Sequence, residues 1–362
     1  MPVRLGGLGL RRATKSLAAA YIGAHAQAAP HLQRAFPNGL PDGHPMRVSI
    51  DRALSKLAQS LGPLLANQWI PEQGQDTIAH FRSEAGAALA DQFQHSVTAL
   101  SESRTFQSRL NTVNAENKAR LLSCSGPLAG VWLTAPLGSP RSRMSDDEFA
   151  CAVRFRIGLP PIDDVSGRCT CRSRQSFQID AWHGLSCISL KRRQVNQRHN
   201  NVVRIMASTV QRLGAFAHIE PSRLDNTRIR PDLELQIGAR RILVDVAIVH
   251  PCAPSHQRRA QRSLGTANHA ERRKHRRYDN LARTRRGIFL PFVVETHGAF
   301  ASSARALMRQ IAAFAGRELP SQTRHATLIR LMTEVSVAVQ KGNAHAALDC
   351  IQDAEGVRIG MA

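Results

Sequence analysis

The chain has 362 residues, which is room for two or three domains and excludes a single small module. It carries 49 Lys and Arg against 27 Asp and Glu, a formal net charge of +22 at pH 7, which excludes an acidic, self-solvating chain. A polyanion is therefore the leading class of partner. Only six of the basic residues are lysine, so an arginine-rich coding bias is a second source of the charge.

The cysteine count and the hydropathy indicate the cellular compartment of the protein. Seven cysteines, an odd and unevenly spaced set, do not indicate a disulfide framework and favour a reducing environment. No apolar run reaches the roughly 18 residues that a membrane helix needs, so we expect no membrane partner. The N-terminus contains arginines and no acid before Asp42, which is also typical of a transit peptide. We predict a nuclear or cytoplasmic location in preference to an organelle.

The first part of the chain is predicted to be helical. Apolar residues recur at steps of three and four over 49–62 and at steps of four over 81–97. A third helix is predicted over 104–122, ahead of Gly126-Pro127. These apolar stripes indicate a helical core without chemistry, and we place a helical domain at 1–127.

A loop rich in Gly, Pro and Ser, at 126–143, separates this domain from a short helix. Ser145 and Glu148 form a capping box, with acidic residues at the positive end of the helix dipole. The helix is expected to end at Gly158. We predict a segment at 144–195 that contains this helix and a metal-binding connector.

The remaining chain changes from helical to mixed periodicity. It is predicted to form an α/β domain at 196–345, followed by a tail at 346–362. The fold class is therefore mixed, an α-helical N-terminal region followed by an α/β domain. The expected elements, in chain order, are a helix at 198–213, strands at 229–237, 241–249 and 288–296, and a helix at 302–314.

A cluster of cysteine and histidine in the connector is the sharpest local signal. Cys169, Cys171, His183 and Cys187 match the Cys3His set that structural zinc favours. The single residue between the first two cysteines is tighter than the usual spacing of two to four. His199 is a possible substitute ligand. The alternative is a set of unrelated buried cysteines.

Two aspartates are predicted to face each other in a β-hairpin. If the hairpin turns at Gly238-Ala239 with a type II′ turn, cross-strand partners have residue numbers that sum to 477, as Asp232 and Asp245 do. Like charges directly opposite destabilise a sheet. A bound Mg²⁺, which prefers oxygen ligands, would compensate. In the alternative, Asp232 merely opens a strand and Asp245 pairs with an arginine such as Arg240.

A basic stretch follows the hairpin. Residues 258–286 hold 11 Lys and Arg against Glu271 and Asp279, a difference of +9. As a helix this stretch would suit salt-dependent phosphate contacts, although a solvated helix would have the same composition. Lys274 is one of only two lysines between Lys118 and Lys341, and an ammonium, unlike a guanidinium, can give up its proton.

As an ordered set, these motifs resemble the C-terminal part of non-LTR retrotransposon polyproteins that carry a restriction-enzyme-like endonuclease of the PD-(D/E)xK fold. The start of the chain, PVRLGGLGLRRA, is similar to the end of a reverse transcriptase thumb, and the likeness spans about 1–320. The motifs are SDDEFACAVRFRIGLPP, Cys169-x-Cys171 with Asp180, His183 and Cys187, Arg198-His199-Asn200, Glu220-Pro221, Arg230-Pro231-Asp232, Asp245-Val246, Lys274 with Tyr278, and FLPFVVETHGAF.

The resemblance implies an Mg²⁺-dependent endonuclease that nicks DNA. Asp232 and Asp245 would hold the metal, and Lys274 would polarise the attacking water. The resemblance also implies that Cys169, Cys171, His183 and Cys187 bind zinc in a region that grips nucleic acid. For Arg198 and His199 it implies a structural or phosphate-positioning role. The nucleic-acid-binding candidates are Arg198, His199, Arg272, Arg273, Arg276 and Arg277.

Two departures from the family pattern limit the interpretation. The simplest form of the motif places a lysine two residues after the second acid, where this chain has Ala247, so Lys274 would have to act from a following helix. The Asp-Asp pairs at 146–147 and 163–164 lack the context of a polymerase strand. We therefore predict a nicking fragment of a retrotransposon protein whose partner is DNA, with RNA as a second candidate. The alternative is a catalytically degenerate nucleic-acid-binding remnant of the same element.

Overall fold

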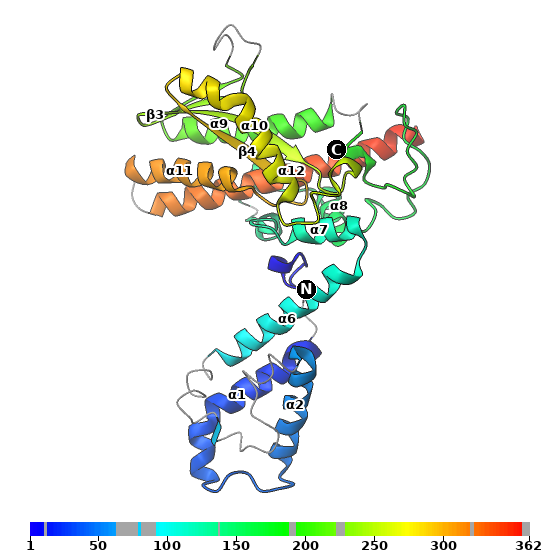
Figure 1. The fold of residues 1–362 in the computed structure, drawn as a ribbon, viewed down its shortest axis with the longest axis vertical. Coiled ribbons are helices and arrows are strands. Elements are labelled where there is room, and N and C mark those ends of the chain that lie inside the picture. Colours follow the sequence, from blue (N-terminus) through cyan, green and yellow to red (C-terminus); the bar gives the residue numbers. More distant parts are fainter. Residues whose placement is uncertain are drawn as a thin grey trace. The chain divides into compact units, whose positions relative to one another are not determined.

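The computed structural model describes residues 1–10, 13–62, 79–80, 92–136, 138–187, 193–221, 229–318 and 322–356 (Figure 1). It divides into two compact units: unit 1 is Met1–Pro2 with Gly9–Val113, and unit 2 is Val3–Leu8 with Asn114–Ala362. N-terminal helices precede a mixed four-stranded sheet with flanking helices, which confirms the predicted fold class. None of the described helices is both long and apolar enough to span a bilayer.

Unit 1 is built from three described helices, α1 (Ala13–Ala35), α2 (Pro45–Leu61) and α6 (Phe93–Thr112), which pack around a shared apolar core. The helix predicted over 49–62 is confirmed as α2. The helix α1 was not predicted, because its buried face consists largely of alanines and forms a weak apolar stripe. Of the helix predicted over 81–97, residues 81–91 lie outside the described residues.

The prediction of one helix over 104–122 is wrong, because the helix is interrupted between Thr112 and Ala115. The helix α6 ends at Thr112, and α7 (Ala115–Cys124) begins after Asn114. The Asn114 side chain accepts a hydrogen bond from the backbone N–H of Asn117 at 2.9 Å, which makes Asn114 an N-cap. The N-cap Asn114 thus marks the start of a second helix within a continuous apolar pattern.

The first long helix of unit 2 to follow α7 is α8 (Asp146–Ile157), and it has the predicted capping box. Glu148 Oε2 accepts from the backbone N–H of Ser145 at 2.8 Å, and Ser145 Oγ accepts from that of Glu148 at 3.2 Å. The helix ends at Gly158, whose φ of 81° suits a glycine C-cap. Unit 2 also contains the short 3-10 helices η1 (Val3–Leu5), η2 (Val131–Thr134), η3 (Pro140–Ser142), η4 (His183–Leu185) and η6 (Pro254–His256).

The sheet of unit 2 has the strand order β1-β2-β3-β4. Strands β1 (Phe216–Ile219), β2 (Leu233–Ile237) and β3 (Arg240–Val249) are antiparallel neighbours, and β4 (Ile288–Glu295) runs parallel to β3. Leu233 is opposite Val244 and Ile237 is opposite Arg240, so the predicted hairpin register is confirmed. Gly238 has a φ of 58° at the turn, as a glycine-first type II′ turn requires.

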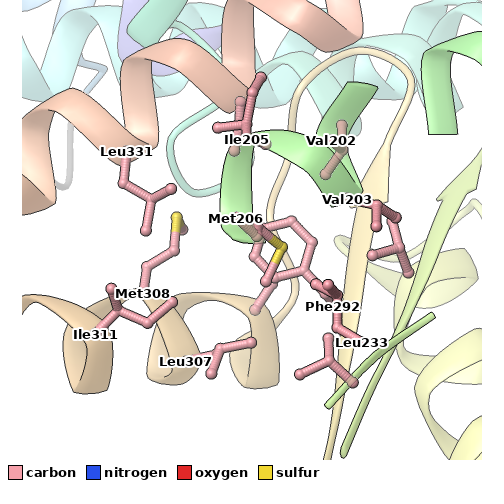
Figure 2. Packing of buried hydrophobic residues seen from close by; sticks show 14 of the residues in the cluster. Val202, Val203, Ile205, Met206, Leu233, Phe292, Leu307, Met308, Ile311 and Leu331 are labelled. Carbon is pink, nitrogen blue, oxygen red and sulfur yellow. The ribbon is translucent and has the colours of Figure 1, made fainter. Parts of the chain in front are cut away.

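Alternation along β3 divides its side chains between two helical layers. Ile242, Val244 and Val246 face the larger core, formed with α9 (Gln194–Arg212), α11 (Ser302–Glu318) and α12 (Gln322–Glu355). Figure 2 shows side chains from these helices and from β2 and β4 meeting in that core. Leu243 and Ala247 face the opposite way, toward α10 (Gly265–Thr284). Asp245 belongs to this second set.

The last two helices run side by side (Figure 1), and only one of them was predicted. The helix expected over 302–314 is confirmed as α11. The 34-residue α12 was missed because its buried stretch, 331–340, includes the polar residues Thr333, Glu334, Ser336 and Gln340. Its polar and apolar residues therefore do not divide into an exposed and a buried face. The helix α12 continues past residue 345, the predicted end of the α/β domain, to Glu355. The domain limits remain predictions.

Candidate functional site

Asp245 is the centre of a polar cluster between β3 and α10. Its side chain is 6% exposed and receives two hydrogen bonds from α10. Lys274 Nζ donates to Oδ2, and the Tyr278 hydroxyl donates to Oδ1 at 2.7 Å. Because Lys274 and Tyr278 are four residues apart, they lie on the same face of the helix. The alternative in which Asp245 pairs with an arginine such as Arg240 is therefore wrong.

Burial governs the titration of both partners of Asp245. Burial lowers the pKa of Lys274, the charge of Asp232 partly offsets this, and Arg277 lowers the pKa further. Burial likewise raises the pKa of the Tyr278 hydroxyl. A lysine with a lowered pKa gives up a proton more readily than an exposed lysine does.

Asp232 lies one residue before β2 and is tied to the strand that carries Asp245. Its Oδ2 accepts a hydrogen bond from the backbone N–H of Val246 at 2.6 Å and lies 3.0 Å from His199 Nε2. Since Leu233 is opposite Val244 and Val246 directly follows Asp245, Asp232 lies beside Asp245 at the start of β2. The structure thus brings together the residues predicted to be catalytic, Asp232, Asp245 and Lys274.

Arg198 and His199 point to different places, although they are adjacent on α9. Arg198 is 2% exposed and donates from Nη1 to Asn343 Oδ1 of α12 at 2.6 Å, and burial lowers its pKa to about 10. A Cβ at Gly342 would lie 2.4 Å from Arg198 Cγ, so glycine is required there. Of the two roles left open for Arg198, the structure supports the structural one. Because the side chain is buried, it is not available for direct contact with nucleic acid.

His199 instead faces the aspartate site. Burial alone would lower the pKa of His199, but its hydrogen bond to Asp232 and the charge of that carboxylate raise it above the ordinary value. The alternative in which His199 replaces a zinc ligand is wrong, because the ring contacts Asp232 and Asn200.

The solvent-facing side of α10 is basic. Its inward side carries the Lys274 and Tyr278 contacts, and the predicted phosphate-contacting arginines lie on the outward side, all exposed. Within the described chain no carboxylate forms an ion pair with any of these arginines, and the guanidinium of Arg277 lies 5.5 Å from the ring centroid of Tyr278. They are Arg272, Arg273, Arg276 and Arg277.

The four predicted zinc ligands converge in unit 2. The ligand atoms of Cys169, Cys171, His183 and Cys187 all lie within 4.8 Å of one another. The Sγ atoms of Cys169 and Cys187 are 3.7 Å apart, and Cys171 Sγ is 3.3 Å from His183 Nε2. Tetrahedral thiolates about 2.3 Å from zinc are about 3.8 Å apart, so this donor set can hold the ion.

The surroundings of the cluster also suit a metal. Hydrogen bonds with Ser173 and His183 outweigh burial and lower the pKa of Cys171 to about 5, whereas burial raises that of Cys169 to about 11. Asp180 Oδ2 lies 3.8 Å from His183 Nδ1, on the side of the ring away from the thiols. A carboxylate in that position orients a metal-binding imidazole.

Cys350 is a fourth thiol at the cluster, and it was not among the predicted ligands. It lies on α12, and its Sγ donates to Cys169 Sγ at 3.5 Å. Nothing in the spacing pointed to it, because 163 positions separate it from Cys187. The neighbouring 3-10 helix also packs closely on α12, since a Cβ at Gly184 would lie 2.1 Å from the carbonyl oxygen of Ala346.

A cavity of about 320 Å³ lies where the carboxyl ends of β3 and β4 meet α7, α8 and the connector that carries the Cys3His group. It is lined in part by His250 and His297, which follow the two strands, and by Trp182 of the connector. Burial lowers the pKa of His250 to about 3 and takes that of His297 well below the ordinary value. Of this pair, His297 lies in the motif FLPFVVETHGAF, but no spacing indicated that the two histidines would lie together.

These features define a mixed α/β protein with a Cys3His group and a separate carboxylate and lysine site. No protein-family model matches the chain, and no curated protein matches it.

Proposed function

We propose that this chain is a metal-dependent endonuclease that nicks DNA and belongs to a retrotransposon protein. The single observation that carries the proposal is the contact between Lys274 and Asp245, with Asp232 hydrogen-bonded to the next residue of the same strand. Two carboxylates can hold a metal ion that assists phosphodiester hydrolysis, and a nearby lysine can polarise the attacking water. The resemblance of the ordered motifs to non-LTR retrotransposon endonucleases supports the same reaction.

The donor set suits Mg²⁺, which binds through one or two carboxylates and keeps several waters. Asp232 and Asp245 would hold the ion. When bound, Mg²⁺ lowers the pKa of a coordinated water and neutralises charge that develops on the phosphate. Lys274, whose pKa burial lowers, would polarise the attacking water. The exposed arginines of α10 would position the DNA backbone beside this group.

The Cys3His group would hold zinc in the same proposal. Its connector contacts α12 through Cys350 and Gly184, so zinc would fix the connector to the sheet-containing part of unit 2. Exposed arginines at 168, 172 and 174 surround the cysteine loop and would add contacts to nucleic acid.

A plasmid-nicking assay with Mg²⁺ tests the proposal. We expect wild-type protein to convert supercoiled to open-circular DNA and Asp245→Ala to lose about 100-fold or more of that rate, because metal catalysis contributes several kcal/mol. Asp279→Ala is the matched control. It removes a half-exposed carboxylate of α10 that pairs with His275 and lies outside the site.

Equal nicking by wild type and Asp245→Ala would overturn the assignment of the site. A wild-type protein that binds DNA and does not cut it with Mg²⁺ or Mn²⁺ would support the alternative function, a degenerate nucleic-acid-binding remnant.

A further inference from the structure

We infer that His199 is a positioning residue that fixes the Asp232 carboxylate for cation binding, an inference that rests on the proposed function. Asp232 Oδ2 has two partners, the Val246 backbone N–H at 2.6 Å and His199 Nε2 at 3.0 Å. Since a carboxylate only accepts, His199 Nε2 is the donor. Within the described chain no group donates to Oδ1. One oxygen is thus held by the protein, and the other is left for a cation.

The support for His199 is rigid on both sides. Val246 belongs to β3, the central strand of the core, and Arg198, next to His199, is buried against Asn343 of α12. His199 Nδ1 lies 3.2 Å from Asn200 Oδ1, which contacts the ring from its other side. A carboxylate held between a core strand and a fixed helix turn loses little further freedom on binding a metal, and that is how residues behind metal ligands raise affinity.

Space is available on the solvent side of this pair. A cavity of about 280 Å³ is lined by His199, Asp232 and five further residues from α9 and the segment around β1. The side chains of His199 and Asp232 are 29% and 20% exposed, so solvent reaches the carboxylate from the cavity. A cation that keeps several waters, as Mg²⁺ does, requires such a half-open position.

A purely structural role of His199 and a positioning role predict different effects of its removal on cation affinity. If His199 only stabilises the fold, its removal lowers the free energy of unfolding and leaves cation affinity unchanged in the folded protein. If it positions Asp232, removal weakens cation binding. A substitute that donates from the same place, such as the amide of glutamine, then restores the affinity.

The experiment measures Mn²⁺ binding to the full-length, zinc-loaded chain from the electron paramagnetic resonance signal of free Mn²⁺, without DNA. Mn²⁺ binding that is present in wild type and lost in Asp245→Asn is assigned to this site. We expect His199→Leu to weaken that binding by about 10- to 100-fold, the usual effect of losing a partner behind a metal ligand, and His199→Gln to stay within a few-fold of wild type. His275→Leu is the matched control, because His275 makes a similar contact with Asp279 at 2.9 Å on α10.

Three results would contradict the inference. If His199→Leu binds as tightly as wild type while Asp245→Asn does not bind, the role of His199 is wrong and the cation site stands. If His275→Leu weakens binding as much as His199→Leu does, the effect is not specific to Asp232. If wild type and Asp245→Asn bind Mn²⁺ equally, the cation site of the proposed function is wrong, and the inference about His199 fails with it.

Discussion

Lys274 of α10 contacts the carboxylate of Asp245 on β3 although 29 positions separate the two residues. The contact lies beside an apolar cluster in which Leu243, Tyr278 and Leu281 join the same strand and helix. A buried charge is tolerated only when it is paired and hydrogen-bonded. The polar contact and the apolar cluster therefore fix the same face of α10 on the sheet and direct the remaining arginines outward.

The hydroxyl of Tyr278 should contribute measurably to stability. It donates to Asp245 Oδ1 at 2.7 Å, and Tyr278→Phe would leave that buried oxygen without this donor. We expect a loss of about 1–3 kcal/mol in the free energy of unfolding, measured by urea denaturation. Tyr21→Phe, at a residue that is 39% exposed, is the control and should change stability by less than about 0.5 kcal/mol. Equal stability of Tyr278→Phe and wild type would mean that Asp245 is satisfied by other groups.

The Cys3His group predicts one zinc ion per chain. Metal analysis should find it in wild type and in Cys252→Ser, whose thiol lies outside the group, and should not find it in Cys187→Ser. Chelation should lower the melting temperature of wild type, because metal binding free energy contributes to folding. A chain that contains no zinc and still folds, or a Cys187→Ser variant that retains zinc, would contradict the prediction.

The outward arginines of α10 predict a salt-dependent interaction with DNA. The double variant Arg272→Gln/Arg276→Gln should bind duplex DNA more weakly and show a slope of log affinity against log salt that is smaller by about 2, roughly one for each phosphate that an arginine no longer neutralises. Arg309→Gln/Arg324→Gln removes the same charge from exposed positions on α11 and α12, on the other side of the sheet. If the two double variants weaken binding equally, net charge and not the face of α10 governs the affinity.

The buried histidines predict a loss of stability in mild acid. His297 is 3% exposed and stacks on Phe155 with ring centroids 3.9 Å apart, and its pKa is well below the ordinary value. The unfolded chain takes up a proton near pH 6.5 that the folded chain does not, so stability is fully present above that pH. Below it we expect a loss of up to about 1.4 kcal/mol per pH unit for each such histidine.

Urea denaturation at several pH values between 7.5 and 5.5 measures this dependence. His297→Phe keeps an aromatic ring on Phe155 and removes the titrating group, so its stability should depend less steeply on pH than that of wild type. Parallel pH curves for the two proteins would show that His297 is protonated alike in the folded and unfolded chains.

Several features depended on local rules and could be predicted. The hairpin register follows from a glycine turn between two alternating strands, and it was correct to the residue. The capping box at Ser145 and Glu148 depends on residues three positions apart. The Cys3His group was found because its members are close in the chain and their types are those that zinc binds.

Other features depended on packing and could not be predicted. Arg198 looked like a phosphate contact, because an arginine on an amphipathic helix is usually solvated, but its helix turns it against Asn343. The long α12 buries Thr333, Glu334, Ser336 and Gln340, although they are polar, because other parts of unit 2 surround the helix. Cys350 contacts the Cys3His group only because α12 returns beside the connector.

The sequence by itself determined the mixed fold class, the pairing of Asp232 with the strand of Asp245, and the ligand types of the Cys3His group, because each follows from short-range periodicity or spacing. Only the tertiary structure decided that Lys274 faces Asp245 while its neighbouring arginines face solvent, and that His199 contacts Asp232. The physical reason is that side chains project from all sides of a helix. The contacts with the strands against which α10 packs determine which of its basic side chains are buried.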